Sequence, residues 1–365
     1  MDLSFNIETA LHAMQKVCPL SERRQTLPIL NSVKIEFVEG EARFTGTDME
    51  SELTITVDNA QGSGAIAIGA RKFLDIIKAA KEYQEIRLTL DGHRVIARAG
   101  RGRYVLASLP VGDFPSLELG TGKISWQMSQ GTLKRLINRA AFAMANQDVR
   151  FYLIGMLFEL SGHTFRVVAT DGHRLAANAV VLDQEFPENT RVIVPRRTVT
   201  ELERLLSGDA EKVHISLSDS TIRFSGTDWS FVSKLIDGRY PDYEKVIPQG
   251  AMRRICAERD ILKGALQRVG ALLEGRQFPV EWQVSKNNLK FVIKNEGEEA
   301  EDELDLEYEG GTLSVIYKFN YLLDMLNALD AGAIEIWMVE SNQAMKIEQN
   351  HGSEKGIYVL MPMKA

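Results

Sequence analysis

The sequence predicts an α+β protein made of three copies of one domain, each with helices packed on antiparallel sheets. Three observations support this prediction. The chain has 365 residues, which is too many for one ordinary domain. The same order of helix-like and strand-like segments recurs along it, with corresponding landmarks 123 to 126 residues apart. Hydrophobic residues make up 44% and charged residues 25% of the chain, as in folded globular proteins.

Each copy begins with a predicted amphipathic helix. Apolar residues three and four positions apart run through Ile7–Val17, Leu133–Ile137 and Leu262–Val269. Because an α-helix turns once in 3.6 residues, this spacing places the apolar side chains on one face. We therefore expect a helix at each of these segments.

Strand-like segments follow each first helix and end at a polar turn. The turns lie at Asp48, Asp171 and Asn295, at steps of 123 and 124 residues. Polar and apolar residues alternate over 42–57 and 212–224, which indicates strands with one buried face. Turn signals separate such strands in VEGE, DGHR and SKNN.

A second helix and a closing strand complete each copy. The second helices are predicted near Arg71, Arg196 and Phe319, at steps of 125 and 123 residues. Each copy then ends in a strand and an extended tail, and Pro115 and Pro241 in the first two tails are 126 residues apart. Four landmarks that keep one spacing and one order indicate true repetition.

Short linkers are expected between the copies. Glycine, proline and polar residues gather at 118–124 and at 247–252. We therefore predict domains over residues 1–120, 121–249 and 250–365.

Composition excludes several classes of protein. The formal net charge is −7, so any DNA contact must be local or topological, since bulk attraction to phosphates requires excess Lys and Arg. The longest apolar runs are short, such as Ala176–Leu182, and the chain does not open with a basic segment followed by an apolar one. We expect no membrane span, no membrane partner and a cytoplasmic location. Cys18 and Cys256 lie far from other metal ligands, so we expect buried, inert thiols and no metal site.

Catalytic motifs are weak or missing. The sequence contains no phosphate-loop, nucleophile-elbow, zinc-protease or dinucleotide motif. The glycines at Gly62 and Gly100 are best interpreted as turns at strand ends. Asp171 and His173 would share one face of a strand and could act as an acid/base pair. The corresponding turns of the other copies, GTDMES and KNEGEE, contain no histidine, which favours a turn or recognition role.

An acidic run over Glu296–Leu306 allows three interpretations. Carboxylates could bind magnesium, or the run could be a solvated strand and its loop. The third possibility is an edge strand that pairs with a basic strand of another subunit, for which Arg98, Arg101 and Arg103 are candidates.

Basic side chains recur near the predicted helices. Such residues usually mark a solvated face. Their recurrence at corresponding places raises the alternative of a DNA-facing surface that holds phosphates without reading bases. These residues are Arg71, Lys72, Lys134, Arg135, Arg139, Arg196, Arg197 and Arg268.

Six segments together resemble a known family, the bacterial DNA polymerase III beta subunit, over the whole chain. They are RRQTLPILNSV at Arg23, ANQDVRFYLIGMLFE at Ala145, VATDGHRLA at Val168, VPRR at Val194, SKLIDGRYPDYEKVIP at Ser233 and YVLMPM at Tyr358. The resemblance implies a non-catalytic, cofactor-free sliding clamp. Two three-domain chains would close head to tail into a six-domain ring of the DNA-clamp type, with helices inside and antiparallel sheets outside. The ring would encircle double-stranded DNA irrespective of sequence and give the replicative polymerase its processivity.

The resemblance also implies partners and a site for them. The partners are the DNA polymerase III alpha subunit, the clamp loader delta subunit, and other polymerases and repair proteins that carry clamp-binding peptides. Methionine and leucine would form a soft groove for the apolar side chains of an extended peptide. The implied pocket comprises Leu153, Thr170, Gly172, His173, Arg174, Leu175, Pro241, Val246, Tyr321, Val359, Leu360, Met361, Pro362 and Met363.

Two further residue sets follow from the resemblance. The implied DNA contacts are Arg24, Arg71, Gln147, Phe151, Tyr152 and Arg196. The implied dimer contacts are Arg98, Arg101, Arg103, Tyr104, Leu106, Leu272, Leu273, Glu301 and Glu303. We expect the opposite charges of the two edges to enforce head-to-tail closure, because two like edges repel.

The chain departs from the family pattern at a few positions. Lys245 and Lys364 stand where arginine is frequent, which removes the planar guanidinium fork from the pocket rim. Phe151 stands where tyrosine is frequent. The stretch LLEGRQFPVEW at Leu272 lacks an arginine often found before the strand, which leaves DNA contacts in the third domain open.

Two other functions compete with the clamp. A metal-dependent nuclease built on the acidic run would lose magnesium-dependent turnover when Glu301 and Asp302 are changed. A repeat scaffold that binds only proteins would need no recurring basic residues on its helices. Retention on circular DNA separates the three functions.

Overall fold

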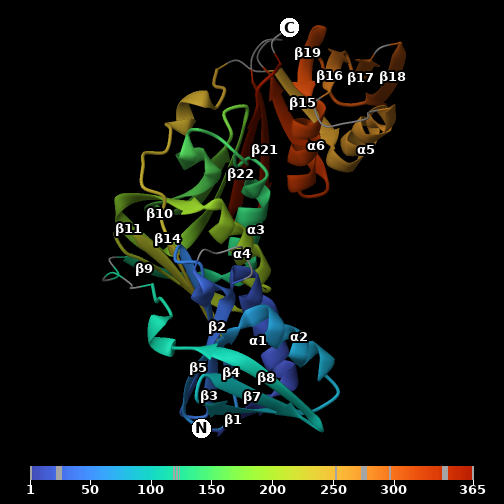
Figure 1. Cartoon of the computed structure of the whole chain (residues 1–365). Coiled ribbons are helices and arrows are strands. Elements are labelled where there is room, and N and C mark those ends of the chain that lie inside the picture. Colours follow the sequence, from blue (N-terminus) through green and yellow to red (C-terminus); the bar gives the residue numbers. More distant parts are fainter. Residues whose placement is uncertain are drawn as a thin grey trace. The chain divides into compact units, whose positions relative to one another are not determined.

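The computed structural model describes residues 2–21, 27–117, 120, 122, 124–250, 253–272, 278–295, 297–338 and 344–363. The chain folds into two compact units (Figure 1). The first contains Met1–Gln130 and Ser207–Leu235, and the second contains Gly131–Leu206 and Ile236–Ala365. Every strand pairing among the described residues is antiparallel, which confirms the predicted α+β class.

The first unit contains a continuous 12-stranded sheet in the order β1-β6-β7-β8-β5-β2-β3-β4-β14-β13-β12-β9. Its strands are β1 Asp2–Asn6, β2 Ser32–Val38, β3 Glu41–Thr47, β4 Ser51–Asp58, β5 Gly64–Gly69, β6 Glu85–Asp91, β7 Arg94–Ala99, β8 Gly102–Leu109, β9 Ile124–Ser129, β12 Lys212–Leu217, β13 Thr221–Ser225 and β14 Trp229–Lys234. Pairing of β4 with β14 joins the first repeat to part of the second.

Two helices cover a face of this sheet: α1 (Ile7–Ser21) and α2 (Ala70–Ala79) lie side by side (Figure 1). Asn6 caps α1, because its Oδ1 accepts the backbone N–H groups of Glu8 and Thr9 at 2.9 and 3.2 Å. The helix approaches the sheet closely at Gly46, where an added Cβ would lie 2.7 Å from Val17 Cγ1. Short 3₁₀ helices at η1 (Pro28–Asn31) and η2 (Val111–Asp113) complete the described part of this unit.

The second unit contains two sheets. The larger has the order β10-β11-β22-β21-β20-β15, and the smaller has the order β18-β17-β16-β19. The strands are β10 Gly155–Thr170, β11 Arg174–Pro195, β15 Arg253–Glu258, β16 Pro279–Ser285, β17 Asn288–Asn295, β18 Glu298–Asp305, β19 Leu313–Lys318, β20 Ala333–Met338, β21 Met345–His351 and β22 Glu354–Leu360. Pairing of β11 with β22 joins the second repeat to the third.

The helices of the second unit lie at the predicted segments. They are α3 Gln130–Ala141, α4 Arg196–Leu205, α5 Arg259–Val269 and α6 Phe319–Ala328, with 3₁₀ helices η3 Phe151–Ile154, η4 Tyr243–Val246 and η5 Gly270–Leu272. α5 and α6 pack against each other, and α5 also covers β17 and β18 (Figure 1). The repeated order of helix, strands, helix and strands is therefore confirmed.

The two compact units do not coincide with the three predicted repeats. The sheets run on from one repeat into the next through β4–β14 and β11–β22, so the central repeat shares hydrogen-bonded strands with both neighbours. The periodicity of the sequence therefore identifies three repeats, whereas contacts in space group the chain into two units because the sheets are shared between repeats.

Smaller predictions have mixed outcomes. No described helix is long and apolar enough to cross a membrane. The run Ala176–Leu182 lies inside β11. Cys18 is buried as predicted, but the prediction was wrong for Cys256, which is only half-buried in β15. Burial raises the pKa of the Cys256 thiol, which reduces its thiolate fraction.

Candidate functional site

One face of the sheet formed by β10, β11 and β22 carries the candidate site. Thr170 pairs with Leu175, and Leu175 pairs with Val359, so these three side chains lie next to one another on that face. The opposite face is closed on the side of α3. There Tyr358 stacks near Phe142 and donates a hydrogen bond to Asn178 Oδ1 at 2.8 Å.

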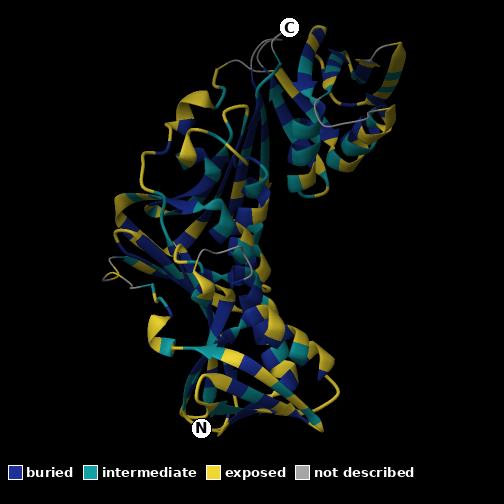
Figure 2. Cartoon of the chain, in the orientation of Figure 1, coloured by how far each residue is buried: buried dark blue, intermediate teal, exposed yellow. Residues whose placement is uncertain are grey.

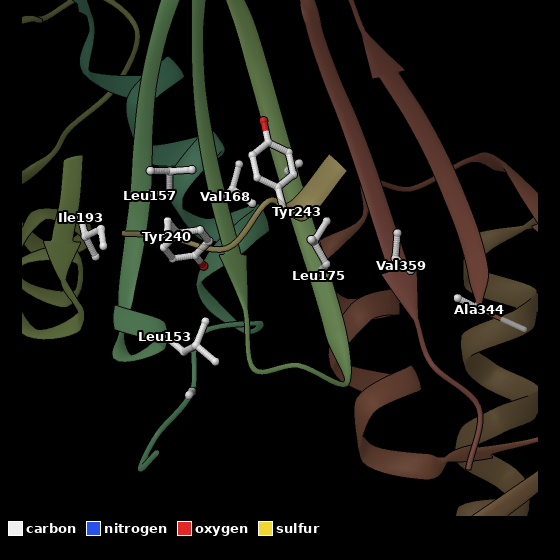
Figure 3. Packing of buried hydrophobic residues seen from close by; sticks show 11 residues of the cluster. Leu153, Leu157, Val168, Leu175, Ile193, Tyr240, Tyr243, Ala344 and Val359 are labelled. Atoms are coloured by element: carbon white, nitrogen blue, oxygen red, sulfur yellow. The ribbon is translucent and has the colours of Figure 1, made fainter. Parts of the chain in front are cut away.

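Residues 240–249 cross the open face of this sheet, and we call them the crossing segment. Tyr240 and Tyr243 are buried in the same apolar cluster as Leu157, Val168 and Leu175 (Figure 3). Tyr240 Oη accepts the backbone N–H of Thr170 at 3.1 Å, which fixes the segment to the end of β10.

A hollow of about 550 Å³ opens between the crossing segment and the strand ends, and we call it the pocket. Its wall is mainly apolar, with a few polar groups at the rim, which is the usual composition of a ligand-binding cavity. It is lined by Arg150, Leu153, Thr170, Gly172, His173, Arg174, Leu175, Pro241, Asp242, Tyr243, Val246, Val359 and Met361.

Most of the residues that the resemblance implied for the pocket come together there. Four do not line it: Tyr321, Leu360, Pro362 and Met363. Leu360 is fully buried, and strand alternation directs it to the face opposite Val359. Beyond Met361 the chain turns away, and the Met363 N–H donates to Ile316 O on β19 at 2.8 Å.

Tyr321 supports the pocket through Arg174. The Arg174 guanidinium lies 4.3 Å from the centre of the Tyr321 ring, and it forms an ion pair with Asp324 on α6 at 2.7 Å. Arg174 also donates through Nε to Asp171 Oδ2 at 3.1 Å. These contacts hold one pocket wall against α6.

Asp171 and His173 do not form an acid/base pair. The prediction that they share a strand face was wrong, because residues 171–173 form the turn between β10 and β11. Asp171 Oδ1 accepts the backbone N–H groups of His173 and Arg174 at 2.9 and 3.0 Å. The carboxylate therefore stabilises the turn, and Gly172 provides its positive φ of 89°.

Sequence reasoning missed Arg150, Asp242 and Tyr243 in the pocket wall. Arg150 forms an ion pair with Asp148 at 2.8 Å and donates to Asp171 O at 3.4 Å, so it bridges two loops at the rim. Hydrogen bonds from Arg150 lower the pKa of Asp148 to about 2. The i, i+2 spacing of Asp148 and Arg150 was the available signal.

Tyr243 is held by a cluster of charged groups behind the pocket. Its hydroxyl donates to Glu159 Oε2 at 2.7 Å and accepts from Arg166 Nη1 at 2.7 Å. Arg191 Nε donates to the other Glu159 oxygen at 2.6 Å. Burial alone would raise the pKa of Glu159, but the hydrogen bonds from Tyr243 and Arg191 and the nearby positive charges outweigh burial and lower it.

The residues implied as DNA contacts differ in their surroundings. Arg24 lies outside the described residues. Arg71 is exposed on α2 and pairs with Asp75 at 3.3 Å. Arg196 is half-buried, and its Nη1 donates to Met144 O at 3.0 Å at the start of the loop that carries Gln147. Burial lowers the pKa of Arg196.

Phe151 and Tyr152 begin η3, directly after this loop. Phe151 is 55% exposed, and its ring lies 5.9 Å from that of Tyr152. The exposed Phe151 ring, the half-buried Tyr152 ring and the exposed Gln147 can contact a ligand without rearrangement of the core.

Other basic helix residues have internal partners, which argues against a purely DNA-facing role. Arg139 is buried and paired with both Glu354 and Asp330, and Arg135 pairs with Glu354. Lys134 Nζ donates to the backbone oxygen of Leu206 at 2.8 Å. For these three residues, the chain uses the charge to attach helix α3 to its surroundings.

Two strands of opposite charge carry exposed side chains: β8, which pairs with β5 only at Ser108 and Leu109, and β18 at the edge of the smaller sheet. The predicted basic strand is a hairpin, because Arg98 lies in β7, Arg101 in the turn and Arg103 in β8. Arg87, Arg98 and Arg103 stand directly opposite one another on β6, β7 and β8. Like charges at paired positions destabilise a sheet unless an acidic partner neutralises them.

Apolar groups flank the basic edge. Along β8, exposed positions alternate with more buried ones (Figure 2). Tyr104 is half-buried and Val105 is 46% exposed, whereas Leu106 is only 7% exposed and belongs to the local core. Leu272 is 41% exposed at η5, and Leu273 lies outside the described residues.

The acidic run forms β18, an edge of the smaller sheet that pairs only with β17 among the described strands. Glu303 stands opposite Lys290, which also pairs with Glu301, and Asp302 pairs with Arg268 on α5. Among the described residues, no group of three or more acidic, histidine or cysteine side chains is arranged to hold a metal ion. The run is thus an edge strand, as both the solvated-strand and the subunit-pairing interpretations require.

Comparison with known proteins places the chain in one family. Models of the DNA polymerase III beta subunit match its N-terminal domain at residues 1–118, its central domain at 127–242 and its C-terminal domain at 244–364. The chain belongs to the DNA polymerase III beta-subunit family. The beta sliding clamps of Salmonella typhimurium and Escherichia coli K12 are each 39% identical to it, and each alignment covers 100% of both chains.

Solved beta-subunit structures agree. The DNA polymerase III subunit beta of Pseudomonas aeruginosa is 37% identical and matches with a TM-score of 0.95 over 100% of both chains. A P. aeruginosa sliding clamp bound to griselimycin is 38% identical, with a TM-score of 0.94 and the same coverage. The family consists of non-catalytic sliding clamps that serve the replicative polymerase, and the three clamp domains of this chain give it that function. The nuclease and scaffold alternatives are therefore set aside.

Proposed function

We propose that two copies of this chain close into a ring around duplex DNA, and that the pocket of each copy holds peptides of the proteins that work there. The observation that carries this proposal is the full-length match to beta sliding clamps together with the apolar pocket beside the crossing segment. We retain residues 1–120, 121–249 and 250–365 as the three domains.

The pocket suits an extended peptide with apolar side chains. Leu153, Leu175 and Met361 supply an adaptable apolar wall. His173, Arg174 and the Thr170 hydroxyl supply polar groups at the turn that can orient the peptide backbone. The proposed occupants are peptides of the polymerase alpha subunit, the clamp loader delta subunit, and other polymerases and repair proteins.

The dimer contact is proposed between β8 of one copy and β18 of the other. β18 is an edge strand, and β8 joins β5 only at Ser108 and Leu109, so residues 102–107 of β8 pair with β7 alone among the described strands. A ladder between the unpaired sides of the two strands would satisfy their free backbone groups. The carboxylates of β18 would neutralise the arginine ladder that ends at Arg103. Two β8 edges would repel each other, so the charges select head-to-tail closure.

The DNA contacts are proposed to involve backbone phosphates and not bases. Arg71, Gln147, Tyr152 and Arg196 are the described polar candidates, with Arg24 as a further one and Phe151 as an apolar neighbour. Few contacts and a net charge of −7 imply weak static affinity, so enclosure must retain the ring. Enclosure keeps a bound polymerase at high effective concentration near the primer end.

Retention on circular DNA tests this proposal. The purified protein is loaded with a clamp loader and ATP onto nicked circular DNA, and its retention is compared before and after the circle is linearised. Loss of the protein on linearisation is the expected result. Retention that is indifferent to DNA ends would indicate an ordinary DNA-binding site, and failure to load at all would contradict a loadable ring.

A further inference from the structure

The sheet face that carries the pocket extends past the crossing segment. Alternate residues of a strand share a face, so Ala179 and Val181 lie on the same side of β11 as Leu175. Arg166 on β10 stands opposite Ala179, which in turn stands opposite Lys355 on β22. The face therefore runs from the pocket at one end to these residues at the other.

The crossing segment divides this face into two hollows. Tyr243 lines both, so the pocket and the second hollow share it as a wall. The second hollow, here called the distal groove, is an open depression of about 1080 Å³. It is lined by Thr164, Arg166, Ala177, Ala179, Val180, Val181, Tyr243, Glu244, Ile247, Gln249, Ser353, Lys355 and Ile357.

The distal groove exposes apolar surface beside an uncompensated cation. Val181 is 60% exposed, and the apolar Ala179 and Ile357 line the groove with it. Arg166 is engaged by Glu159 at 2.9 Å and lies 3.7 Å from Glu244. Lys355 is exposed and forms no ion pair with any described residue. The charge left over in the groove is therefore positive.

We propose that the distal groove is a second interaction surface, occupied by the part of a partner protein that continues directly from the peptide held in the pocket. This inference rests on the proposed peptide-binding function of the pocket. The continuing segment is extended, places an apolar side chain against Val181 and Ile357, and places an acidic side chain at Lys355.

The dimensions agree with a continuous occupant. Val359 lines the pocket and Lys355 lines the distal groove, four residues apart on β22. Four residues of a strand span about 13 Å, so about four extended residues of the partner would connect the two sites. The shared wall at Tyr243 is the point that the partner chain must pass.

The test compares two probes on the full-length protein. One is the purified catalytic subunit of the replicative polymerase from the same organism, and the other is the shortest peptide of that subunit that still binds. Dissociation constants are measured for the unchanged protein, for the groove variants Lys355→Glu and Val181→Asp, and for the pocket variant Met361→Asp. Matched controls are Lys286→Glu at an exposed turn and Val38→Asp at the exposed end of β2, which make the same changes outside both sites.

Each groove variant is expected to weaken binding of the whole subunit by about fivefold to tenfold, as loss of one exposed ion pair or one apolar contact would. The same variants should leave the short peptide unaffected, whereas Met361→Asp should weaken both probes. Unchanged melting temperatures for the groove variants would show that they fold normally.

Three results would overturn the inference. If the groove variants bind both probes as their controls do while Met361→Asp still weakens both, the proposed role of the distal groove is rejected and the proposed function of the pocket is kept. If the groove variants weaken the short peptide as much as the subunit, the groove only supports the pocket wall. If Met361→Asp changes neither probe, the proposed pocket function fails, and the groove fails with it.

Discussion

At the scale of single residues, Glu159 shows how a buried charge can shape a binding surface. Its side chain joins Arg166, Arg191 and the Tyr243 hydroxyl behind the pocket wall. Removing one partner from a buried charged cluster leaves the others without compensation, which costs more than an exposed ion pair contributes. The position of Tyr243 therefore depends on residues that no ligand touches.

We predict that Glu159→Gln lowers the free energy of unfolding by about 2 kcal/mol at neutral pH. The folded-state pKa of Glu159 is lowered, so its contribution is complete above the unfolded value of about 4.3 and is lost as pH falls through the lower folded value. Urea denaturation at neutral pH and below pH about 4 measures this difference.

The difference in free energy of unfolding between the unchanged protein and Glu159→Gln should therefore be smaller in acid than at neutral pH. Glu188→Gln, at an exposed position of β11, is the matched control and should change little at either pH. A gap of equal size at both pH values would contradict the assignment of the stabilising role to the ionised carboxylate.

Residue roles were only partly predictable from the sequence. The turn at Asp171–Arg174 was predicted as a turn or recognition element, but the bonds of its carboxylate depend on where β10 ends, which alternation cannot fix. Tyr243 was missed because its importance comes from lying across a sheet whose residues are distant in sequence, such as its partner Glu159, which is 84 residues away. Arg139 was assigned to a helix surface because its partner Glu354 is 215 residues away.

At the scale of elements, α3 is attached to β22 by charge. Arg139 contacts Glu354 and Asp330, and Arg135 contacts the same glutamate. Glu354 is 5% exposed, so its charge needs both arginines. Because α3 belongs to the predicted second domain and β22 to the third, this cluster links the two.

We predict that Arg139→Met lowers the free energy of unfolding by about 3 kcal/mol, because Glu354 and Asp330 lose a shared cation. Combining it with Glu354→Gln should cost less than the sum of the single changes, since the buried charge is then removed as well. Urea denaturation of the four proteins in the cycle measures the coupling. Strict additivity would mean that the two residues contribute independently.

The edges β8 and β18 carry the prediction for assembly. Arg103→Glu should yield monomers, because it places negative charge on the edge that is proposed to receive the carboxylates of β18. Mass measurement in solution reports the change, with Arg94→Glu at the far end of β7 as the control. An unchanged dimer mass for Arg103→Glu would reject charge-selected closure.

The elements themselves were more predictable than their neighbours. The helices from α1 to α6 fall where apolar spacing and the repeated landmarks placed them, because both signals are local in the sequence. The pairings β4–β14 and β11–β22 were not predictable, since alternation shows that a strand has a buried face but not which strand lies beside it. The predicted basic strand proved to be a hairpin because a glycine turn at Gly100 interrupts it.

At the scale of the whole molecule, the proposed function allows the protein to stay on DNA without a high affinity for DNA. A protein held by phosphate contacts dissociates as salt rises, because counterions compete for the phosphates. A closed ring leaves DNA only by opening or by sliding off an end. The candidate phosphate contacts are few and the net charge is negative, so enclosure and not affinity should keep the protein on DNA.

We predict that clamps already loaded on closed circular DNA stay bound when salt is raised from about 50 to about 200 mM, a range over which a protein with several phosphate contacts loses orders of magnitude in affinity. Gel filtration of the circles with labelled protein measures the retained fraction. The linearised circle is the control, and loss from both forms with the same salt dependence would contradict enclosure.

The opposite charges of β8 and β18 have one more consequence, which concerns direction. Copies that join head to tail are related by rotation about the axis of the ring, so every surface of one copy faces the same way as its equivalent on the other. Both pockets of the proposed dimer would then open on a single side. Although such a ring does not recognise base sequence, its two sides would differ. The orientation in which it is loaded on DNA would therefore decide which way its bound partner proteins face.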